Sequence, residues 1–243
     1  MKGWGWQGEF TLETVRAHWN QVAPVYDGWN KTYDTTHFQR FEEGLKHLDL
    51  EAGMRVLDVW CRTGNASRYI SAACPEAHYF GLELAEELLW QAHQKYPQRD
   101  FVHGTMVHLP FASASFERVV SLETLEHIPN PIQFLQEIHR VLQPGGRLVM
   151  STPPATAEWM TALVDRLGVN HGEGPRRFLS SKEVKMLLAQ TGFQLLLHRG
   201  TLLIPAGPRL LRRWGQEWLD VRVQGSFLAE FGIRQFYVCE STA

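Results

Sequence analysis

Between residues 54 and 239 the chain alternates short apolar runs with segments whose apolar residues recur at helical spacing. The run Met54–Val59 (MRVLDV) is almost continuously apolar, as expected for a strand buried on both faces of a sheet. After it, Ala66, Tyr69 and Ile70 fall on one face of a helix. Strands that alternate with helices predict a mostly parallel sheet with helices on both faces. We therefore expect a doubly wound α/β fold.

Six more apolar runs bring the predicted sheet to seven strands. Pro131 stands at a first helical position after Asn130, and Ser180 with Glu183 offers a capping box, so both pairs mark helix starts. In such a sheet the ligand site lies at the carboxyl ends of the strands, near the switch point. Functional residues are therefore expected there. The further predicted strands are 78–82, 100–103, 117–121, 147–150, 193–197 and 235–239.

Length and composition fit one globular domain with modest additions. The chain has 243 residues, 44% of them hydrophobic and 21% charged, so it can bury a core without disulfides or metals. The net charge of −2 argues against a surface built for nucleic acid. No apolar run reaches the ~18–20 residues of a membrane span, and no signal peptide is visible. Three cysteines without CxxC spacing and eleven histidines without HExxH predict a cytoplasmic protein with neither a disulfide framework nor a metal site.

The two ends of the chain differ from this alternating middle. We expect an N-terminal helical cap (1–50), an α/β core (51–200) and a lid segment with the last strand (201–243) within the same domain. The C-terminal stripe is predicted to pack on the domain as a lid helix. The alternative is contact with a membrane or a partner through residues 209–221, because Arg beside Leu and Trp suits an anionic lipid interface. The cap stripe is Phe38, Phe41, Leu45 and Leu48, and the C-terminal stripe is Leu210, Trp214, Trp218 and Val221, flanked by Arg209, Arg212 and Arg213.

The residues that follow the first predicted strand carry the most specific signal. The stretch Val56–Asn65 reads VLDVWCRTGN. It resembles the S-adenosylmethionine-binding loop of class I methyltransferases, in which an acidic residue is followed by glycine at alternate positions. Aligned on Asp58, those positions hold Trp60, Arg62 and Gly64, so only the last glycine is present.

Further pieces of the same family pattern follow in order. Glu83, at the end of the second predicted strand, stands where the family places an acid on the cofactor ribose, and a carboxylate can accept from both hydroxyls. Residues 104–106 (GTM) resemble the adenine-contacting segment, with Thr105 where Asp is usual. Residues 22–27 (VAPVYD) and 144–146 (PGG) resemble the cap and the fifth-strand entry of small-molecule, quinone-biosynthesis-type methyltransferases.

The resemblance, over roughly residues 18–200, implies an enzyme that transfers a methyl group from S-adenosylmethionine to a small molecule. Attack of the acceptor on the sulfonium methyl would be aided mainly by positioning in a closed, dry site. The aromatic cap favours a flat or lipophilic acceptor. The residues expected to hold the cofactor are Asp58, Trp60, Arg62, Gly64, Glu83, Leu84, Thr105, Met106, Val107 and Ser121, with Tyr26 in a lid above it.

His127 is the candidate general base. It lies in the loop after the fourth predicted strand, above the expected site, and imidazole titrates near neutral pH. The alternative is a structural role, which the corresponding Glu-His-Ile/Val-Pro segment of the family often has.

Trp60 and Arg62 leave the function open between two classes. Of nine tryptophans, Trp60 alone stands at a loop glycine. If the backbone there needs positive φ, a bulky residue is strained by ~1–2 kcal/mol, and its ring either fills the methionine pocket or stacks elsewhere. Arg62 either pairs with a cofactor or substrate carboxylate or points into solvent. The second class is a pseudo-methyltransferase or altered-cofactor protein that keeps the fold but acts as a binding or scaffold subunit. The absence of GxGxxG argues against a nicotinamide dehydrogenase.

Overall fold

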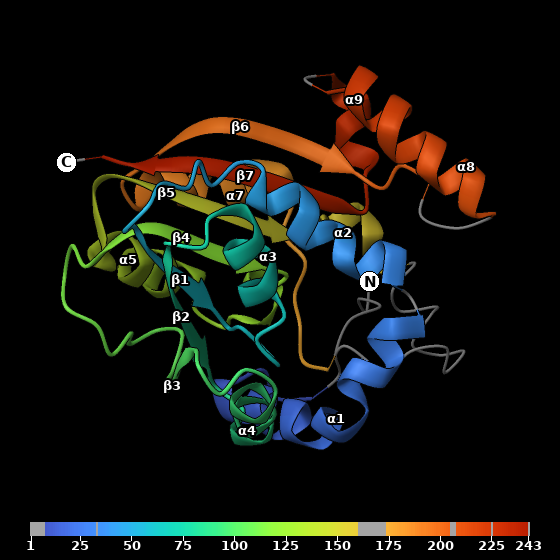
Figure 1. Cartoon of the computed structure of the whole chain (residues 1–243). Helices are drawn as coiled ribbons and strands as arrows, with labels where there is room; N and C mark the ends of the chain where they lie inside the picture. Colours follow the sequence, from blue (N-terminus) through green and yellow to red (C-terminus); the bar gives the residue numbers. More distant parts are fainter. Residues whose placement is uncertain (1–7, 33, 160–173, 205–207, 225, 243) are drawn as a thin grey trace.

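The centre of the computed structural model is a seven-stranded sheet in the order β3-β2-β1-β4-β5-β7-β6 (Figure 1). Strands β1 to β5 are parallel, and β7 runs antiparallel to β5 and β6. This confirms the predicted doubly wound, mostly parallel sheet. The described residues are 8–32, 34–159, 174–204, 208–224 and 226–242. The strands are β1 (Arg55–Val59), β2 (His78–Glu83), β3 (Asp100–His103), β4 (Phe116–Leu122), β5 (Leu142–Thr152), β6 (Phe193–Thr201) and β7 (Arg234–Ser241).

The strand order reverses at β1, which pairs with β2 on one side and with β4 on the other. Asp58 lies opposite Gly81 of β2 and Val120 of β4. The carboxyl ends of these three strands therefore meet at one edge of the sheet, at the kind of switch point where doubly wound sheets bind ligands. Glu83 ends β2 and Ser121 lies near the end of β4, so both belong to this edge.

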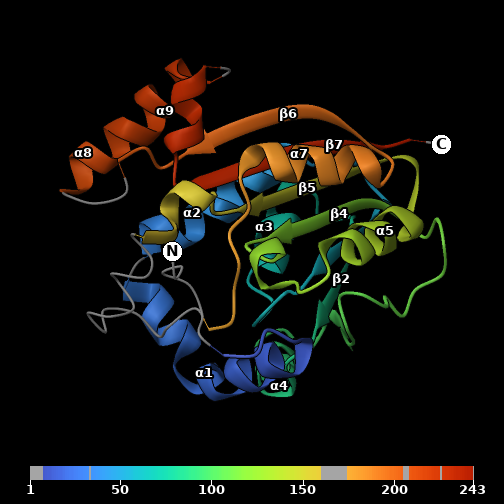
Figure 2. The same ribbon diagram turned by 180° about the vertical axis from the view of Figure 1, so that it is seen from behind.

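Helices cover both faces of the sheet, with α5 and α7 on one face and α2 and α3 on the other (Figures 1 and 2). Alternate residues of each strand divide between the two cores. Leu57 and Val119 belong to the core that contains the apolar residues of α5 and α7, and Val56 and Val120 to the core beneath α2 and α3. Burial on both faces explains why the strands read as continuous apolar runs. The helices are α2 (Asp34–Leu45), α3 (Ala66–Ala73), α4 (Glu86–Lys95), α5 (Pro131–Val141) and α7 (Ser181–Gln190).

The predicted helix starts at α5 and α7 are confirmed. The side chain of Asn130 accepts a hydrogen bond from the backbone N–H of Gln133 at 3.3 Å, with Pro131 in the first turn. At α7 the Ser180 hydroxyl accepts from the N–H of Glu183 at 3.3 Å, and the Glu183 carboxylate accepts from the N–H of Ser180 at 2.8 Å. These bonds satisfy N–H groups that a helix start otherwise leaves without partners.

The Pro-Gly-Gly turn lies inside β5 rather than before it. Leu142 pairs with Phe116 of β4, and pairing resumes only at Arg147, opposite Arg118. The residues between them, including Gly145 with a φ of +75°, do not pair with β4. Turn chemistry was predicted correctly, but a single strand continues on both sides of it.

The predicted N-terminal helical region contains α2 and a longer helix, α1 (Leu12–Thr32). Near the end of α1 the carboxylate of Asp27 accepts hydrogen bonds from Lys95 Nζ at 2.7 Å and from Thr63 Oγ1 at 2.9 Å. The first bond reaches α4 and the second the loop after β1. These two hydrogen bonds hold helix α1 beside the carboxyl edge of the sheet (Figure 1).

The C-terminal helical segment stands away from the sheet beyond the end of β6 (Figure 1). It consists of α8 (Arg209–Trp214), a five-residue π-helical turn (Gly215–Leu219) and α9 (Asp220–Arg222), followed by a 3₁₀ turn (Phe227–Phe231) and β7. In the described part of the chain no helix is long and apolar enough to cross a bilayer.

The apolar stripe of this segment faces outward, so the prediction that it packs on the domain is wrong. Its exposed fractions are 83% for Leu210, 47% for Trp214, 46% for Trp218 and 50% for Val221. The segment packs through the opposite side, where Asp220 is buried and accepts a hydrogen bond from the N–H of Leu202 at 2.8 Å. Periodicity showed that these residues share a face but could not show which way the face points.

Candidate cofactor site

The loop after β1 keeps the backbone of a glycine loop although two of its glycines are replaced. φ is +66° at Trp60, +56° at Arg62 and +72° at Gly64. In this region a side chain of a bulky residue meets its own backbone, which costs about 1–2 kcal/mol per residue. Both replaced positions thus have the positive φ for which backbone strain was predicted.

Gly64 is required at its position for two reasons. Besides its positive φ, a Cβ atom there would lie 2.6 Å from the Cζ atom of Phe101, closer than real Cβ contacts allow. Phe101 comes from β3, so the loop packs directly on a neighbouring part of the sheet. The loop thus retains a glycine at the position where a neighbouring side chain leaves no room for a Cβ atom.

The ring of Trp60 lies inside the site. It is 2% exposed, and its Nε1 donates a hydrogen bond to Glu83 Oε1 at 2.8 Å. The rings of Trp19 and His127 meet it edge-on, with centroids at 5.5 and 5.0 Å. The guanidinium of Arg62 lies 3.2 Å from the ring centroid. The ring is thus buried beside Glu83 at the carboxyl edge of the sheet, and its position in the methionine pocket stays a prediction.

Glu83 is fully buried and accepts four hydrogen bonds. Oε1 accepts from Trp60 Nε1 and from the N–H groups of Leu84 at 2.9 Å and Ala85 at 2.8 Å, and Oε2 accepts from the N–H of Arg62 at 2.7 Å. Burial raises the pKa of Glu83 to about 7, although the charge of Arg62 and these hydrogen bonds act in the opposite direction. The carboxylate thus links the loop after β1 to the residues that precede α4.

Asp58 lies on β1, two residues before Trp60. Its Oδ2 accepts a hydrogen bond from the hydroxyl of Tyr79 at 2.9 Å. Burial raises the pKa of Asp58 to about 6, and the hydrogen bond from Tyr79 and the charges of Arg40 and Arg62 lower it. Asp58 is thus a buried carboxyl group that lines the same small cavity as Trp60 and Arg62.

Arg62 turns into the molecule, not into solvent. Its Nη2 donates to the carbonyl oxygen of Glu123 at 3.3 Å, and its guanidinium also lies 4.0 Å from the ring centroid of Trp19. Its Nη1 is buried and has no hydrogen-bond partner among the described residues. A cavity of about 10 Å³ adjoins it, which is room for about one water molecule. The cavity is lined by Tyr26, Arg40, Phe41, Asp58, Trp60, Cys61, Arg62, Asn65 and Leu122.

A second buried polar cluster continues from Arg62 across the ends of β4, β5 and β7. Glu123 Oε1 accepts from Arg234 Nε at 3.1 Å and from the Ser151 hydroxyl at 2.7 Å. Arg234 Nη1 donates to Gln39 Oε1 at 2.7 Å. Charged and polar groups thus extend from the loop after β1 along the carboxyl edge of the sheet.

His127 is buried between the rings of Trp19 and Trp60. Its Nδ1 lies 2.9 Å from the carbonyl oxygen of Pro175, which can only accept, so Nδ1 carries the proton. Burial and then the charge of Arg62 lower the pKa of His127 well below its usual range. A neutral imidazole with a low pKa is a weak base, and general-base catalysis by His127 stays a prediction.

The residues predicted for the adenine side lie where β3 ends. Thr105 Oγ1 is buried without a hydrogen-bond partner among the described residues, and Met106 is fully buried, with the partly buried Val107 against the same core. On β4 the hydroxyl of Ser121 is likewise buried without a described partner. Buried hydroxyls of this kind are donors and acceptors that a ligand could satisfy.

Sequence reasoning missed Trp19 and Arg40. Trp19 meets Trp60, and Arg40 Nη2 donates to the hydroxyl of Tyr26 at 3.0 Å. A signal was available for Trp19, because Val15, Trp19 and Tyr26 recur at helical spacing and form one buried face of α1. That spacing does not show that the face covers the loop after β1.

Comparisons with known proteins agree with this architecture. Residues 57–150 match a family model described as a methyltransferase domain. A demethylmenaquinone methyltransferase of Listeria welshimeri is 32% identical over 143 residues, covering 56% of this chain and 61% of the relative. A phthiotriol/phenolphthiotriol dimycocerosates methyltransferase of Mycobacterium ulcerans is 31% identical over 182 residues, covering 72% and 64%. The chain thus spans less than two thirds of the length of these relatives.

Solved structures share the fold at low sequence identity. An S-adenosylmethionine-dependent methyltransferase of Thermotoga maritima superposes with a TM-score of 0.68 at 16% identity, covering 94% of this chain and 99% of that one. A geranyl diphosphate C-methyltransferase of Streptomyces coelicolor, in complex with S-adenosylhomocysteine, gives 0.62 at 15% identity, covering 84% and 79%. At such identities the likeness establishes the fold alone.

Proposed function

We propose that this chain is a class I methyltransferase that transfers a methyl group from S-adenosylmethionine to a small lipophilic acceptor. The match of residues 57–150 to a methyltransferase domain and the methyltransferases among the relatives support the proposal. The observation that carries the proposal is the position of the loop. The pieces of the family pattern lie on neighbouring strand ends at the switch point between β1 and β4. Two of the relatives are named for demethylmenaquinone and for phthiotriol or phenolphthiotriol dimycocerosates, and these names support a lipophilic acceptor.

The chemistry of the site suits the cofactor. Glu83 is a carboxylate at the place of a ribose acceptor, and Thr105 offers a buried hydroxyl, without a described partner, beside the place of adenine. We assign the ribose to Glu83 and Leu84, the adenine to Thr105, Met106 and Val107, and the loop contacts to Asp58, Trp60, Arg62, Gly64, Ser121 and Tyr26.

The described residues leave little space beside Arg62 in this conformation. Ligand pockets of this kind enclose on the order of 300–1,000 Å³, whereas the cavity that described residues line beside Arg62 measures about 10 Å³. Trp60 lines this cavity, and its indole holds Glu83.

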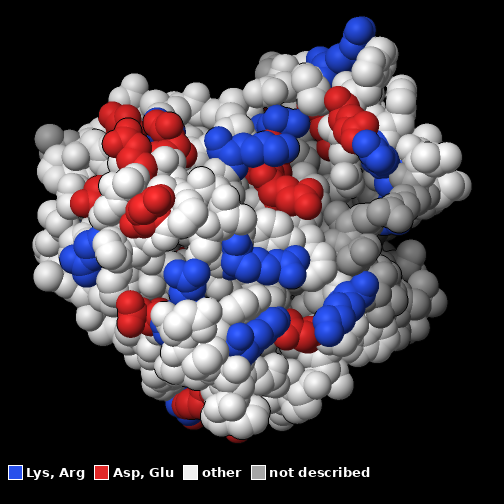
Figure 3. Space-filling view, in the orientation of Figure 1, with Lys and Arg blue, Asp and Glu red and all other residues white. Residues whose placement is uncertain are grey.

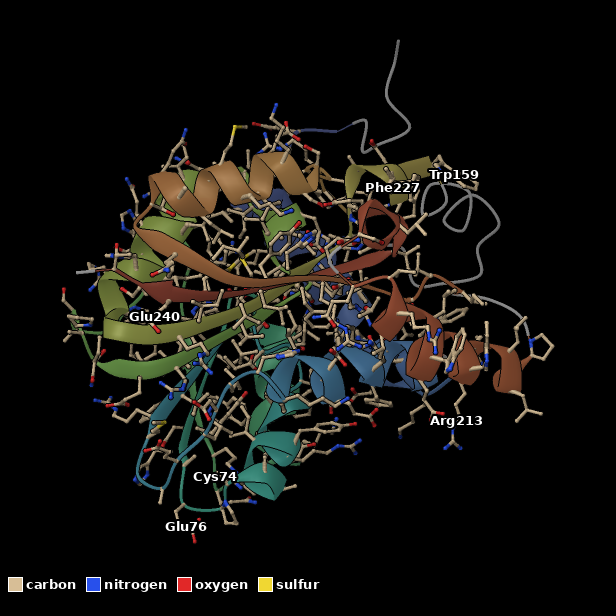
Figure 4. The ribbon with its side chains drawn as sticks, turned by 90° about the horizontal axis from the view of Figure 1, so that it is seen from above. Cys74, Glu76, Trp159, Arg213, Phe227 and Glu240 are labelled. Atoms are coloured by element: carbon tan, nitrogen blue, oxygen red, sulfur yellow. The ribbon has the colours of Figure 1, made fainter. Side chains whose placement is uncertain are left out.

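A peripheral membrane contact is a further part of the proposal. The exposed stripe of α8 and α9 carries Trp214 and Trp218, whose rings stack at 5.4 Å, and Arg222 lies over Trp218 at 4.0 Å. Arg213 lies on the outer side of α8 (Figure 4). On the face shown in Figure 3, acidic and basic side chains are otherwise interspersed. Apolar rings with arginines beside them suit anionic lipid, where a lipophilic acceptor would be dissolved. All three cysteines are free and buried, which supports the cytoplasmic location that we propose.

The second candidate function is that of a pseudo-methyltransferase that binds a partner without transferring methyl groups. The bond between Trp60 Nε1 and Glu83 favours it, because the chain itself satisfies the carboxylate that the cofactor would use.

One titration separates the two candidates. Calorimetry with S-adenosylmethionine and S-adenosylhomocysteine should show micromolar binding to the whole chain if it is a methyltransferase. Absence of binding up to millimolar ligand would overturn the first proposal and favour the second.

A further inference from the structure

We propose that Trp60 controls access to the site: its indole N–H occupies the acceptor on Glu83 that a ribose diol would use, so a nucleoside ligand enters only when this ring leaves. The inference rests on the proposed function, because it takes the ligand to be an adenosyl compound. It assigns to Trp60 a role that neither core packing nor the family's loop pattern supplies.

The acceptor positions on Glu83 Oε1 are occupied within the chain. An ionised carboxylate offers about four lone-pair positions, two on each oxygen, and Glu83 accepts three hydrogen bonds at Oε1 and one at Oε2. A ribose diol brings two more donors. Oε2 can accept one of them, and a donor of the chain must withdraw from Oε1 before the second hydroxyl can bind.

Trp60 is the donor that can withdraw. The bonds from Arg62, Leu84 and Ala85 come from backbone N–H groups, which the loop and the start of α4 fix in place. The bond from Trp60 comes from the end of a side chain that rotates about two single bonds. Rotation of this one ring would free one acceptor position on Oε1 and would also clear the space that it fills.

The backbone at Trp60 indicates that the ring is not there for packing alone. A core tryptophan does not need a φ of +66°, and a glycine would keep the same loop without steric strain. Strained backbone of this kind persists where the surroundings hold it, and it is concentrated at binding and switching sites. Here Trp19, His127 and Arg62 surround the ring and hold it against Glu83.

Calorimetric titration of the full chain with S-adenosylhomocysteine tests the proposal. Trp60→Phe keeps a ring but removes the donor, and it should bind at least about tenfold more tightly than the wild type, since a hydrogen bond to a charged group is worth that much or more. Trp60→Gly removes the ring as well and should bind at least as tightly as Trp60→Phe. Trp90→Phe is the matched control, because Trp90 is an exposed tryptophan on α4, and its affinity should equal that of the wild type.

The outcomes separate this proposal from the proposed function. If the wild type binds as tightly as both Trp60 variants, or more tightly, the access role is overturned while cofactor binding stands. If only the Trp60 variants bind, access control is supported and methyl transfer by the wild type is not. If no variant binds, both proposals are overturned. Thermal unfolding of each variant confirms that it is folded before it is scored.

A spectroscopic measurement follows the ring directly. In a ¹H–¹⁵N spectrum the indole resonance of Trp60 is the one that Trp60→Phe lacks. We expect it to shift when the wild type is saturated with S-adenosylhomocysteine, because the bond to Glu83 breaks. A resonance that stays in place in the saturated complex would contradict the proposal.

Discussion

At the scale of single residues, the loop after β1 combines strain with dense packing. Trp60 and Arg62 hold positive φ values that favour glycine, and both side chains are buried where the family pattern has none. The sequence allowed the strain to be predicted, because the alignment on Asp58 placed both residues at glycine positions. It did not show where the rings would go, because Trp19 on α1 and Glu83 on β2 decide that through contacts between distant segments.

Gly64→Ala should destabilise the fold more than an equivalent change elsewhere. The new Cβ would meet Phe101 at 2.6 Å in addition to the strain of φ +72°, so we expect a loss of about 2–4 kcal/mol in the unfolding free energy. Gly53→Ala is the control, because φ there is +81° but nothing lies within 4 Å, and the loss should be about 1 kcal/mol. Urea unfolding of both variants measures the difference, and equal losses would show that Phe101 moves aside freely.

The buried carboxyl groups make stability depend on pH. Burial raises the pKa of Glu83 to about 7 from its ordinary value of 4.5. Between these values the folded chain binds more protons than the unfolded one, so this contribution to stability is fully present below about pH 4.5 and is lost as pH rises through about 7. Asp58, with a pKa of about 6, acts in the same direction.

Glu83→Gln isolates the contribution of Glu83. The difference in unfolding free energy between wild type and variant should change by about 2 kcal/mol between pH 8 and pH 5.5, with the wild type gaining at the lower pH. Other titrating groups, including His127 with its lowered pKa, cancel in this difference. Denaturant unfolding at the two pH values gives the result, and a difference independent of pH would show that the pKa of Glu83 is not raised.

At the scale of elements, the strands of the central sheet were predictable and the orientation of the terminal helix was not. A strand buried on both faces needs a continuous apolar run, and β1 to β4 lie within one or two residues of their predicted bounds. The stripe of α8 and α9 has helical spacing whether it faces the domain or the solvent. Only the burial of Gly215 and Asp220 on the other side of the segment reveals its direction.

The exposed stripe predicts binding to anionic vesicles. Trp214→Ser combined with Trp218→Ser should weaken sedimentation with phosphatidylglycerol vesicles by roughly 30-fold, since two half-exposed rings contribute about 1 kcal/mol each. Trp90→Ser, on α4, should bind as the wild type does. Phosphatidylcholine vesicles should bind all three proteins weakly, because the arginines have no anionic partner there. A wild type that sediments with neither lipid would refute the contact.

At the scale of the whole molecule, a ligand that binds only the folded chain must stabilise it. S-adenosylhomocysteine at a hundred times its dissociation constant should add about 2.7 kcal/mol and raise the melting temperature by roughly 5–10 °C for a chain of this size. Glu83→Gln should reduce the rise at the same ligand concentration. An unchanged melting temperature at millimolar ligand would agree with the pseudo-methyltransferase and not with the enzyme.

The position of β7 between β5 and β6 affects how the chain folds during synthesis. Both neighbours of β7 are translated before it, and each pairs with it rather than with the other. While residues 234–241 are still in the ribosome, β5 is an open sheet edge and β6 has no strand beside it. Open edges are where nascent chains join one another. The sheet can therefore be completed only after β7 has emerged, and chaperone binding should be strongest in the interval between the synthesis of β6 and the emergence of β7.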